Sequence, residues 1–374
     1  MAEAPVVSYA PTDEHELIRS TARQFLEERL PLERVRELMM SDDGFDRVLW
    51  KEIAELGWTG LAISEEHGGA GLGPVEMGVL VEEMGRLVTP GPFFASAVVA
   101  TTLIQNVATP EQQASLLPGL ASGDSIATAA LFESAHDVDP LGGATTANET
   151  EHGWVISGAK KYVLDGHMAD EFIVSADGGL FVVPSRSAGV TVQQETVLDS
   201  TRRQATVTFD SVEVGASSRL GSSHDVGIGV TKSLETACSL LAVEQVGGAQ
   251  RCMQMAVDYA KTRYQFGRPI GSYQAVKHRC ANMLMKVESS KSAAYHAIRV
   301  TDDDTERPIA SSLAKSLCSD AYVWVAGENI QVHGGIGFTW EHDAHLYLKR
   351  AKASSLMFGS ARHHRQKLGR ALNL

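Results

Sequence analysis

Cysteine is scarce in this chain and is nowhere arranged for metal binding or for disulfide pairing. The 374 residues include four cysteines without a CxxC spacing, namely Cys238, Cys252, Cys280 and Cys318. Zinc sites and disulfide frameworks need clustered or regularly spaced cysteines. The sequence therefore predicts reduced, buried thiols in a cytoplasmic protein.

Basic residues are also in short supply relative to acidic ones. The chain has 33 Lys and Arg against 46 Asp and Glu, which gives a formal net charge of -13 and a pI near 5.5. An acidic surface favours solubility and repels polyanions. We therefore expect neither a nucleic-acid partner nor an anionic membrane partner.

Long hydrophobic runs and targeting patterns are missing as well. No apolar run approaches the roughly 20 residues needed to span a bilayer. The start, MAEAPVVSYAPTDEHEL, lacks the basic and apolar regions of a signal peptide. With 44% hydrophobic and 21% charged residues, the composition predicts a soluble globular protein of two or three domains.

The hydrophobic pattern divides the chain into three parts. Residues 1–122 show helical periodicity, and residues 123–226 carry short β-rich runs separated by Gly, Asp and Pro. Residues 227–374 return to helical periodicity, with long helices expected at Thr231–Arg263 and Pro308–Gln331. The sequence thus predicts a mainly α protein with an N-terminal helical domain, a central antiparallel β barrel or sandwich, and a C-terminal helix bundle.

Two glycine-rich stretches raise the question of phosphate or metal binding. EEHGGAGLG, Glu65–Gly73, lacks the Lys-Ser/Thr ending and the preceding strand of a phosphate loop, so we interpret it as a connector. QVHGGIGFTWEHDAHLYLKR, Gln331–Arg350, contains three histidines. His342 and His345 are spaced to share a helix face, but no third strong ligand follows at a suitable distance. We therefore expect no metal site.

Two segments carry a resemblance to a known family. TRYQFGRPIGSYQAVKHRCANM, Thr262–Met283, is similar to the R-x-x-F-G-x-x-I-x-x-F-Q-x-x-K-H-x-x-A-x-M signature of the acyl-CoA dehydrogenase family of flavoproteins. QVHGGIGFTWEHDAHLYLKRA is similar to the segment of that family that begins Q-x-x-G-G. Weaker matches are AISEEHGGAGLG, GWVISGAKKYV and TRRQATVTFDSVEV. The resemblance covers nearly the whole chain and implies FAD as cofactor, an acyl-CoA substrate and a four-helix bundle as the last domain.

The resemblance also implies residues that serve the cofactor of a neighbouring subunit. In the family, the Gln and the paired Gly of Q-x-x-G-G lie against the pyrophosphate and adenosine end of the neighbour's FAD. Gln331, Gly334 and Gly335 would take this role, because glycine lets a backbone approach a phosphate closely. Arg263 would pair with the pyrophosphate, and Phe266 would pack against the cofactor.

The catalytic base of the family is missing from its usual position. The family converts an acyl-CoA thioester to its 2,3-enoyl form: a Glu removes the α-proton while hydride leaves for the flavin. Such a general base contributes about 10²–10⁴-fold to a rate. The family's Y-E-G-T motif corresponds here to Met357-Phe358-Gly359-Ser360. Phe358 therefore stands where the Glu is expected, and it cannot accept a proton.

Other family members carry the base near the start of the long helix that ends at R-x-x-F-G. That position corresponds here to Ala237. Glu235 lies two residues away, about 200° around the helix, and Glu244 lies on nearly the same face but roughly 10 Å further along the axis. Glu244 also suits a buried structural role. Glu235 and Glu244 are the candidates for a relocated base.

Positions that hold the flavin ring in the family are altered as well. The family's Thr-Glu and Trp-x-Thr pairs correspond to Phe132-Glu133 and Tyr162-Val163-Leu164. Two hydroxyl donors have become Phe132 and Leu164, and each lost hydrogen bond is worth about 0.5–1.5 kcal/mol. The Phe132 ring would also fit the space of a flavin. Residues for the chain's own cofactor are changed, whereas residues for a neighbour's cofactor are kept.

Three hypotheses follow from this asymmetry. The chain resembles the base-lacking companion subunit of heterotetrameric acyl-CoA dehydrogenases that act on sterol side-chain CoA esters. In such an assembly this chain would complete a FAD site that it shares with a paralogous catalytic chain. It would otherwise be a homotetrameric acyl-CoA dehydrogenase with a relocated base. The third hypothesis is a flavin monooxygenase or a non-catalytic acyl-binding protein of the same fold. For a dehydrogenase, the resemblance implies electron-transferring flavoprotein as electron acceptor.

Two further features are interpreted as structural. The pair Gly247-Gly248 permits close packing of the long helix against a neighbour. The C-terminal stretch ARHHRQKLGRALNL is basic and amphipathic. Because the whole chain is acidic, we expect this stretch to pack on the bundle or on a partner chain rather than on a membrane.

Overall fold

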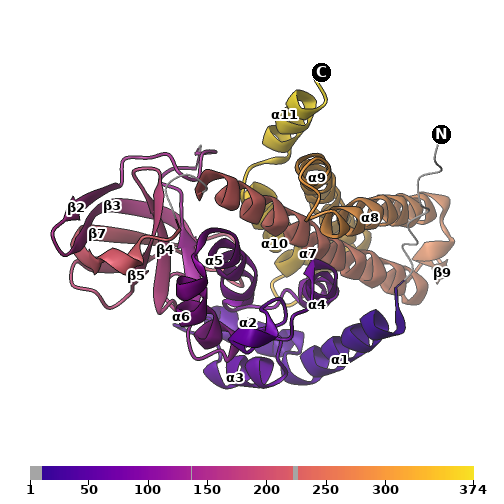
Figure 1. Cartoon of the computed structure of the whole chain (residues 1–374). Coiled ribbons are helices and arrows are strands. Elements are labelled where there is room, and N and C mark those ends of the chain that lie inside the picture. The colour runs from indigo at the N-terminus through magenta and orange to yellow at the C-terminus, as the bar shows by residue number, and fades with distance from the viewer. Residues whose placement is uncertain (1–10, 136, 222–225) are drawn as a thin grey trace.

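The protein is described by a computed structural model that covers residues 11–135, 137–221 and 226–374. Residues 1–10 lie outside the described residues. They belong to the N-terminal stretch for which the sequence predicts no signal peptide. Helices, then strands, then helices follow one another along the chain, in the predicted order (Figure 1). The domain boundaries at 122 and 226 stay a prediction.

The N-terminal region is helical. Its elements are α1 (Asp13–Arg29), α2 (Leu32–Met40), α3 (Arg47–Glu55), the short η1 (Glu65–His67), α4 (Pro74–Arg86), the π-helical η2 (Phe94–Ala100), α5 (Thr101–Val107) and α6 (Pro110–Ala121). Thr12 caps α1, since its hydroxyl accepts a hydrogen bond from the backbone N–H of His15 at 3.3 Å. Gly57 follows α3 with φ +76°, a conformation that favours glycine after a helix.

The central region folds into two sheets. Its strands are β1 (Ala127–Ala130), β2 (Thr146–Thr150), β3 (Gly153–Leu164), β4 (Glu171–Ala176), β5 (Gly179–Pro184), β6 (Val190–Gln194) and β7 (Gln204–Gly215). The sheets have the orders β1-β4-β5 and β2-β3-β7-β6, and their core contains Phe172 and Phe209 with ring centroids 6.3 Å apart. The pairing of β1 with β4 is parallel, unlike the predicted antiparallel arrangement. The intervening β2–β3 hairpin belongs to the other sheet and supplies the long connection that parallel pairing needs.

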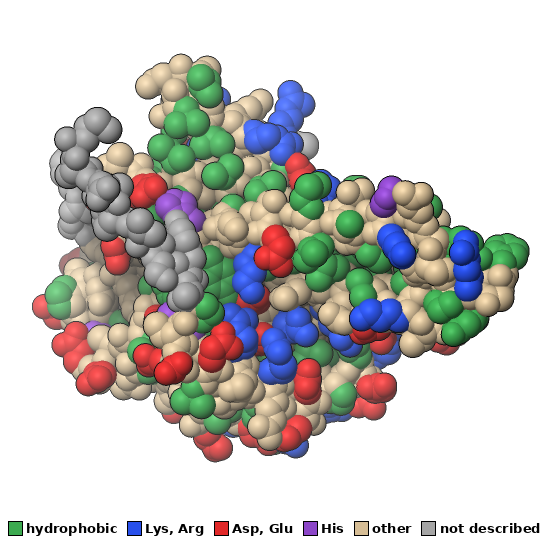
Figure 2. All heavy atoms as spheres, turned by 90° about the vertical axis from the view of Figure 1, so that its right-hand side faces the viewer, with side chains coloured by type: hydrophobic (Ala, Val, Ile, Leu, Met, Phe, Trp, Pro, Cys, Tyr) green, Lys and Arg blue, Asp and Glu red, His purple; other side chains and the backbone are tan. Residues whose placement is uncertain are grey.

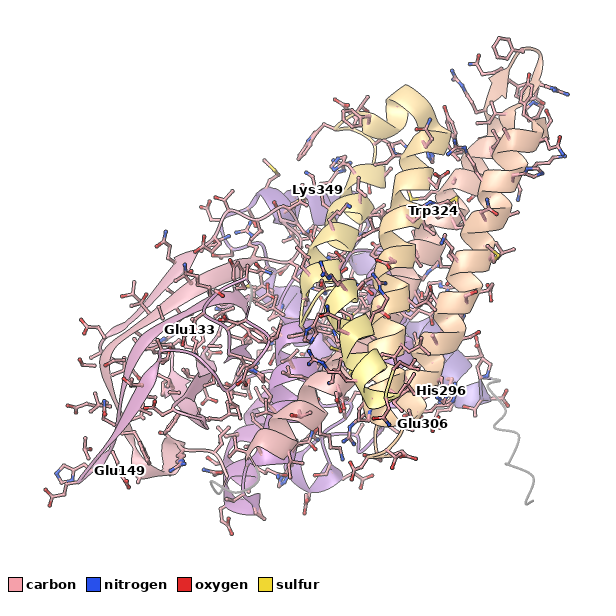
Figure 3. All side chains as sticks on the ribbon, turned by 90° about the horizontal axis from the view of Figure 1, so that it is seen from above. Glu133, Glu149, His296, Glu306, Trp324 and Lys349 are labelled. Atoms are coloured by element: carbon pink, nitrogen blue, oxygen red, sulfur yellow. The ribbon has the colours of Figure 1, made fainter. Side chains whose placement is uncertain are left out.

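The C-terminal region is a helix bundle. It comprises α7 (Val226–Thr262), the hairpin β8–β9 (Tyr264–Gln265 and Arg268–Pro269), α8 (Gln274–Arg299), α9 (Arg307–His333), the short η5 (Gly334–Phe338), α10 (Ala344–Leu356) and α11 (Ala361–Ala371). Figure 3 shows α9 running along the bundle from Glu306 past Trp324, with the β region that carries Glu133 and Glu149 at its side. The C-terminal helix α11 packs on α9, in agreement with the prediction that it packs on the bundle.

Helix α7 is the hydrophobic centre of the molecule. By length and composition it contains an 18-residue window apolar enough to cross a membrane, so the expectation that the chain has no such segment is wrong. In the folded protein 72% of that window is buried. Such burial is typical of the central helix of a bundle, which is surrounded by other helices on all sides.

Glycines bring α7 into backbone contact with the N-terminal region. A Cβ atom on Gly247 would lie 2.0 Å from the carbonyl oxygen of Glu82 in α4, and one on Gly85 would lie 2.1 Å from that of Glu244. A Cβ on Gly248 would meet the ring of Tyr322 in α9 at 2.4 Å. The predicted close packing at Gly247-Gly248 is confirmed.

Charge is unevenly spread over one face of the molecule despite the excess of acidic residues. On the face seen in Figure 2, Lys and Arg side chains gather over the middle of the molecule, with Asp and Glu side chains among and below them. Hydrophobic and basic side chains share the protruding end on the right of that view.

Candidate functional site

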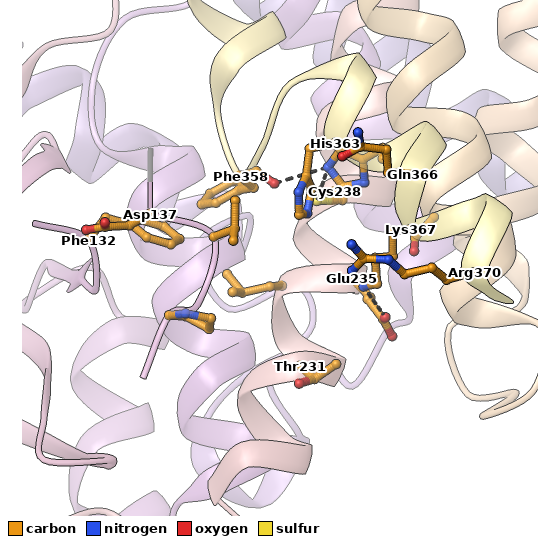
Figure 4. A pocket seen from close by; sticks show the side chains of 15 residues that line it. Phe132, Asp137, Thr231, Glu235, Cys238, Phe358, His363, Gln366, Lys367 and Arg370 are labelled. Atoms are coloured by element: carbon orange, nitrogen blue, oxygen red, sulfur yellow. Dashed lines mark hydrogen bonds and ion pairs between the residues drawn. The ribbon is translucent and has the colours of Figure 1, made fainter. Parts of the chain in front are cut away.

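A cavity of about 390 Å³ opens between the β region, α7 and α11, and is called the crevice below. Its apolar wall includes Phe132, Leu234 and Phe358, and its polar wall includes Glu235 and Lys367. Figure 4 shows Phe132 and Phe358 facing the crevice on one side, and Lys367 and Arg370 of α11 on the other. The fold therefore brings together the positions that the sequence assigned to the flavin ring and to the base.

Phe358 occupies a strained backbone conformation at the crevice. Its φ is +54°, and the following Gly359 has φ +104°. A bulky residue in the left-handed region costs free energy, and such strain is found most often at functional sites. The turn at the position where the resemblance places the family's Glu therefore presents an apolar ring to the crevice.

Two buried groups hold the Phe358 turn in place. The His364 imidazole lies 3.1 Å from the Phe358 carbonyl oxygen, and burial lowers its pKa to about 3. Lys315 donates hydrogen bonds to the carbonyl oxygens of Ser355 and Gly359, each at 3.2 Å, and burial lowers its pKa to about 8. The turn is therefore fixed by hydrogen bonds to main-chain carbonyls from both sides.

The positions expected to contact a flavin ring enclose almost no space. Phe132, Tyr162, Leu164 and Phe358 line a hollow of about 30 Å³. A water molecule needs roughly 10–15 Å³ of such volume. The hollow is thus far too small for the three fused rings of a flavin. With these side chains in place, the site at which this chain would hold its own flavin ring does not fit FAD.

Glu133, next to Phe132, is committed to its own loop. Its carboxylate accepts hydrogen bonds from the backbone N–H groups of Ala144 and Thr145 at 2.7 and 2.9 Å and pairs with Lys160 at 2.9 Å. Although burial opposes ionisation, these hydrogen bonds lower the pKa of Glu133 to about 2. The residue therefore serves as an anionic anchor for the loop after β1.

Glu235 reaches the crevice with both carboxylate oxygens engaged. One oxygen accepts from Arg307 Nε at 3.0 Å, and the other accepts from Lys367 Nζ at 2.6 Å. The side chain is only 4% exposed. To accept a proton from a substrate, the Glu235 carboxylate would first have to break one of these two ion pairs. The arrangement therefore suits a structural role.

Glu244 lies in a buried ion-pair network and does not line the crevice. It pairs with Arg202 at 2.7 Å and with Arg350 at 3.0 Å, while Arg350 also pairs with Asp199 at 2.5 Å. Asp199 and Arg202 follow the β6 strand, whereas Glu244 and Arg350 belong to α7 and α10. The network joins the β region to the bundle.

Asp165 is a titratable group that the motifs did not indicate. It follows β3 directly and is 2% exposed. Burial raises its pKa to about 7, although Arg202 and Arg350 oppose the shift. Asp165 does not line the crevice. No sequence signal could have identified it, because its burial comes from packing between distant segments.

A second group of candidate residues lies at the end of the bundle where α7 and α9 finish together. The ring of Tyr259 in α7 stacks on His333 in α9 at 4.4 Å between centroids. Five exposed residues lie in the last turn of α9 or just beyond the two helix ends, and they are called the bundle tip below: Arg263, Phe266, Gln331, Gly334 and Gly335. Phe266 is 92% exposed and has φ +51°.

The bundle tip fits the pyrophosphate end of a dinucleotide. Gly334 has φ +64°, and a Cβ on Gly334 or Gly335 would meet no atom within 4 Å. Open space thus lies directly over the backbone, where an anionic group can approach. Arg263, which is exposed on the same tip, supplies a positive charge. These are the residues that the sequence resemblance assigns to the FAD of a neighbouring subunit.

The histidines near the tip serve the fold. His342 Nδ1 accepts a hydrogen bond from the Ala344 backbone N–H at 3.1 Å, and its ring lies 4.4 Å from that of His333. His345 lies 3.0 Å from the carbonyl oxygen of Trp340. Within the described part of the chain, no group of three or more His, Cys, Asp or Glu residues is placed to bind a metal ion.

Comparison with known proteins gives a consistent result. Residues 12–124 match the family model "Acyl-CoA dehydrogenase, N-terminal domain" and residues 229–373 match "Acyl-CoA dehydrogenase, C-terminal domain". The chain is 33% identical over 353 residues to acyl-CoA dehydrogenase IpdE2 of Mycobacterium tuberculosis, covering 94% of this chain and 95% of that protein.

Two solved structures are similar over nearly their whole length. A variant of the Tcur3481-Tcur3483 steroid ACAD shares 31% identity with a TM-score of 0.87, covering 96% of this chain and 98% of that chain. The ChsE4-ChsE5 complex from Mycobacterium tuberculosis shares 27% identity with a TM-score of 0.90, covering 98% and 99%.

This chain belongs to the acyl-CoA dehydrogenase family of FAD-dependent oxidoreductases. The predicted family, the fold class and the cofactor are therefore confirmed, including the helical, β and helix-bundle architecture. The roles of individual site residues stay predictions.

Proposed function

We propose that this chain is the base-lacking subunit of a heteromeric acyl-CoA dehydrogenase and completes a FAD site across the interface with a paralogous catalytic chain. The observation that carries the proposal is a contrast within one molecule. Phe358 stands at the position of the catalytic base, and the hollow beside it, at the position of the flavin ring, has a volume of about 30 Å³. At the bundle tip, by contrast, the residues for a neighbour's cofactor are exposed.

The comparisons support a heteromeric assembly and a polycyclic substrate. One similar structure is named as a complex of ChsE4 and ChsE5, and the other is named as a Tcur3481-Tcur3483 steroid enzyme. By analogy, the assembly is a heterotetramer in the cytoplasm that acts on a sterol-type or fatty acyl-CoA. Electron-transferring flavoprotein is the proposed electron acceptor.

The chain's own residues would contribute binding and shape. Arg263 offers a guanidinium to the pyrophosphate, and Gly334 and Gly335 expose backbone to the same group. Phe266 offers an apolar surface, since its side chain is 92% exposed. FAD, when bound, supplies the hydride-accepting chemistry of the family. The α-proton would be removed by a carboxylate of the partner chain.

One alternative has a specific observation in its favour. Glu235 lines the crevice, so a homotetrameric enzyme with Glu235 as a relocated base remains a second candidate. This second candidate requires that the Glu235 carboxylate break its ion pair with Lys367 or with Arg307 in order to accept the substrate proton. It also requires that Phe132 and Phe358 move apart to admit a flavin.

Co-expression separates the two candidates. We expect the chain expressed alone to be colourless, and the chain co-expressed with a paralogous dehydrogenase to carry about one FAD per pair of chains. Absorbance at flavin wavelengths and the mass of the complex measure this outcome. A yellow homotetramer of this chain that reduces an electron acceptor with an acyl-CoA would overturn the proposal.

A matched pair of glycine variants tests the bundle tip. Gly335→Val places a branched side chain over the proposed pyrophosphate position, where no atom of this chain is nearby. We expect the assembled complex to lose FAD while the unfolding temperature of the chain alone is unchanged. Gly215→Val is the control, because Gly215 also has no neighbour within 4 Å of a Cβ but lies in the β region. Equal FAD content in both variants would refute the role of the tip.

A further inference from the structure

Positive charge is concentrated in the C-terminal bundle of this acidic chain. Residues 227–374 contain nineteen Lys and Arg against twelve Asp and Glu, which gives a net charge of +7, whereas residues 1–226 contain fourteen against thirty-four, a net charge of -20. Within the bundle, residues 259–287 carry six Lys and Arg and no Asp or Glu. This segment comprises the end of α7, the hairpin β8–β9 and the first half of α8, so the positive charge gathers at the bundle tip.

Four of these six basic side chains are exposed and make no ion pair with a described carboxylate, and they are called the basic rim below: Lys261, Arg263, Arg268 and Lys277. The other two are engaged, since Arg279 pairs with Glu328 at 2.5 Å and the Lys286 ammonium lies 5.1 Å from the centre of the Trp324 ring. Asp258 is the carboxylate that precedes the segment. Even when Asp258 is counted against it, the basic rim keeps an excess of positive charge.

The hairpin presents aromatic side chains between the members of the basic rim. Tyr264 is 62% and Phe266 is 92% exposed. Phe266 and Gly267 have φ of +51° and +80°, as in the two-residue turn of a tight hairpin. Tyr273 braces the turn, because its hydroxyl donates to a carbonyl oxygen of the hairpin at 3.1 Å and the Arg268 guanidinium lies 4.0 Å from its ring centre. The aromatic rings are thus held outward on a braced support.

A shared FAD accounts for only part of this surface. The pyrophosphate is a dianion, and the proposed function already gives it Arg263 and the exposed backbone of Gly334 and Gly335. Lys261 and Lys277 remain without a partner, as does the exposed ring of Tyr264. Exposed aromatic side chains within a charged rim are typical of protein–protein contacts.

We propose that the basic rim and its aromatic side chains dock on the paralogous catalytic chain, and that the surface of that chain which they contact is acidic. This inference rests on the proposed function and adds to it the charge of the partner and the residues that recognise it. Complementary charge steers association and suppresses wrong partners. A second copy of this chain fits less well, because a tip docked on residues 1–226 of another copy could not reach the FAD of the paralogue.

Charge reversal in the complex of full-length chains tests the proposal. Lys261→Glu combined with Lys277→Glu should raise the apparent Kd of the two chains about tenfold or more at an ionic strength of about 0.01 M, because two exposed ion pairs become repulsive contacts. At about 1 M, where the Debye length is about 3 Å, the difference from the wild type should nearly vanish. Arg47→Glu combined with Lys51→Glu is the matched control, since it reverses two exposed charges in α3, far from the hairpin (Figure 1). Sedimentation on dilution measures the four values.

The outcomes separate this inference from the proposed function. If the complex carries FAD but its Kd changes equally in both double variants, or does not depend on salt, the acidic docking surface is refuted and the shared FAD site stands. If the two chains form no complex at low salt, both proposals fail. Self-association of the isolated chain that Lys261→Glu with Lys277→Glu abolishes would assign the basic rim to a second copy and overturn the choice of partner.

Discussion

Glu235 Oε1 and Lys367 Nζ lie 2.6 Å apart and tie the C-terminal helix α11 to the long helix α7. The second carboxylate oxygen is held by Arg307 of α9, so one buried side chain links three helices of the bundle. The contact also closes one wall of the crevice. In the sequence, Glu235 is the candidate nearest to the family's second base position. In the structure it is part of the scaffold around that position.

Glu235→Gln separates the structural role from a catalytic role. The variant leaves Arg307 buried with a weaker partner, so we expect the free energy of unfolding to fall by about 1–3 kcal/mol. In the assembled enzyme, kcat should stay within about twofold, whereas loss of a general base would lower it by about 10²–10⁴-fold. Urea denaturation and steady-state kinetics measure the two effects. Lys367→Gln is the control, and a loss of kcat in Glu235→Gln alone would restore Glu235 as the base.

Glu244→Gln should be the more destabilising substitution of the two. Both Glu244 oxygens pair with buried arginines, and removing one partner of a buried ion pair costs about 3–5 kcal/mol. Chemical denaturation of the variant checks this value. Glu328→Gln is the comparison, since Glu328 pairs with Arg279 nearer the surface, where such pairs contribute about 0–1 kcal/mol. Similar losses in both variants would contradict the buried network.

His364 should make the Phe358 turn sensitive to acid. Burial lowers its pKa from 6.5 to about 3 in the folded protein. Between these values the unfolded chain binds a proton that the folded chain does not, so stability is complete above pH 6.5 and falls as the pH decreases. At pH 5 this loss amounts to about 2 kcal/mol.

Denaturation of the wild type and of His364→Gln at pH 5, 6 and 7 measures the effect. We expect the stability of the wild type to decline more steeply with falling pH than that of the variant. His152→Gln, at an exposed position, should behave as the wild type does. Parallel pH profiles for all three proteins would show that His364 is not buried in its neutral form.

Two alanine substitutions in long helices should act in opposite directions. A Cβ on Gly247 would lie 2.0 Å from the Glu82 carbonyl oxygen, so Gly247→Ala forces α4 and α7 apart and should cost about 1–3 kcal/mol or more. A Cβ on Gly327 of α9 would meet nothing within 4 Å, so Gly327→Ala should stabilise the chain by up to about 1 kcal/mol. Thermal unfolding of the isolated chain compares them, and a loss of equal size at both positions would count against the close contact of α4 with α7.

The helices and strands were predictable because their patterns are local. The Thr12 cap, the glycine after α3 and the alternation of apolar residues in the β region all act over a few residues. The parallel pairing of β1 with β4 was not predictable in this way. It depends on which sheet the intervening hairpin joins, and that choice is made by packing between distant strands.

The sequence by itself determined the family, the order of helices and strands, and the replacement of a proton acceptor by Phe358, because each depends on the type of residue at a given position. Only the tertiary structure decided that Glu235 and Glu244 are held by cations and that the ring hollow beside Phe132 is nearly closed. These features depend on distances between side chains far apart in the chain, and burial and charge then act on whatever the fold has brought together.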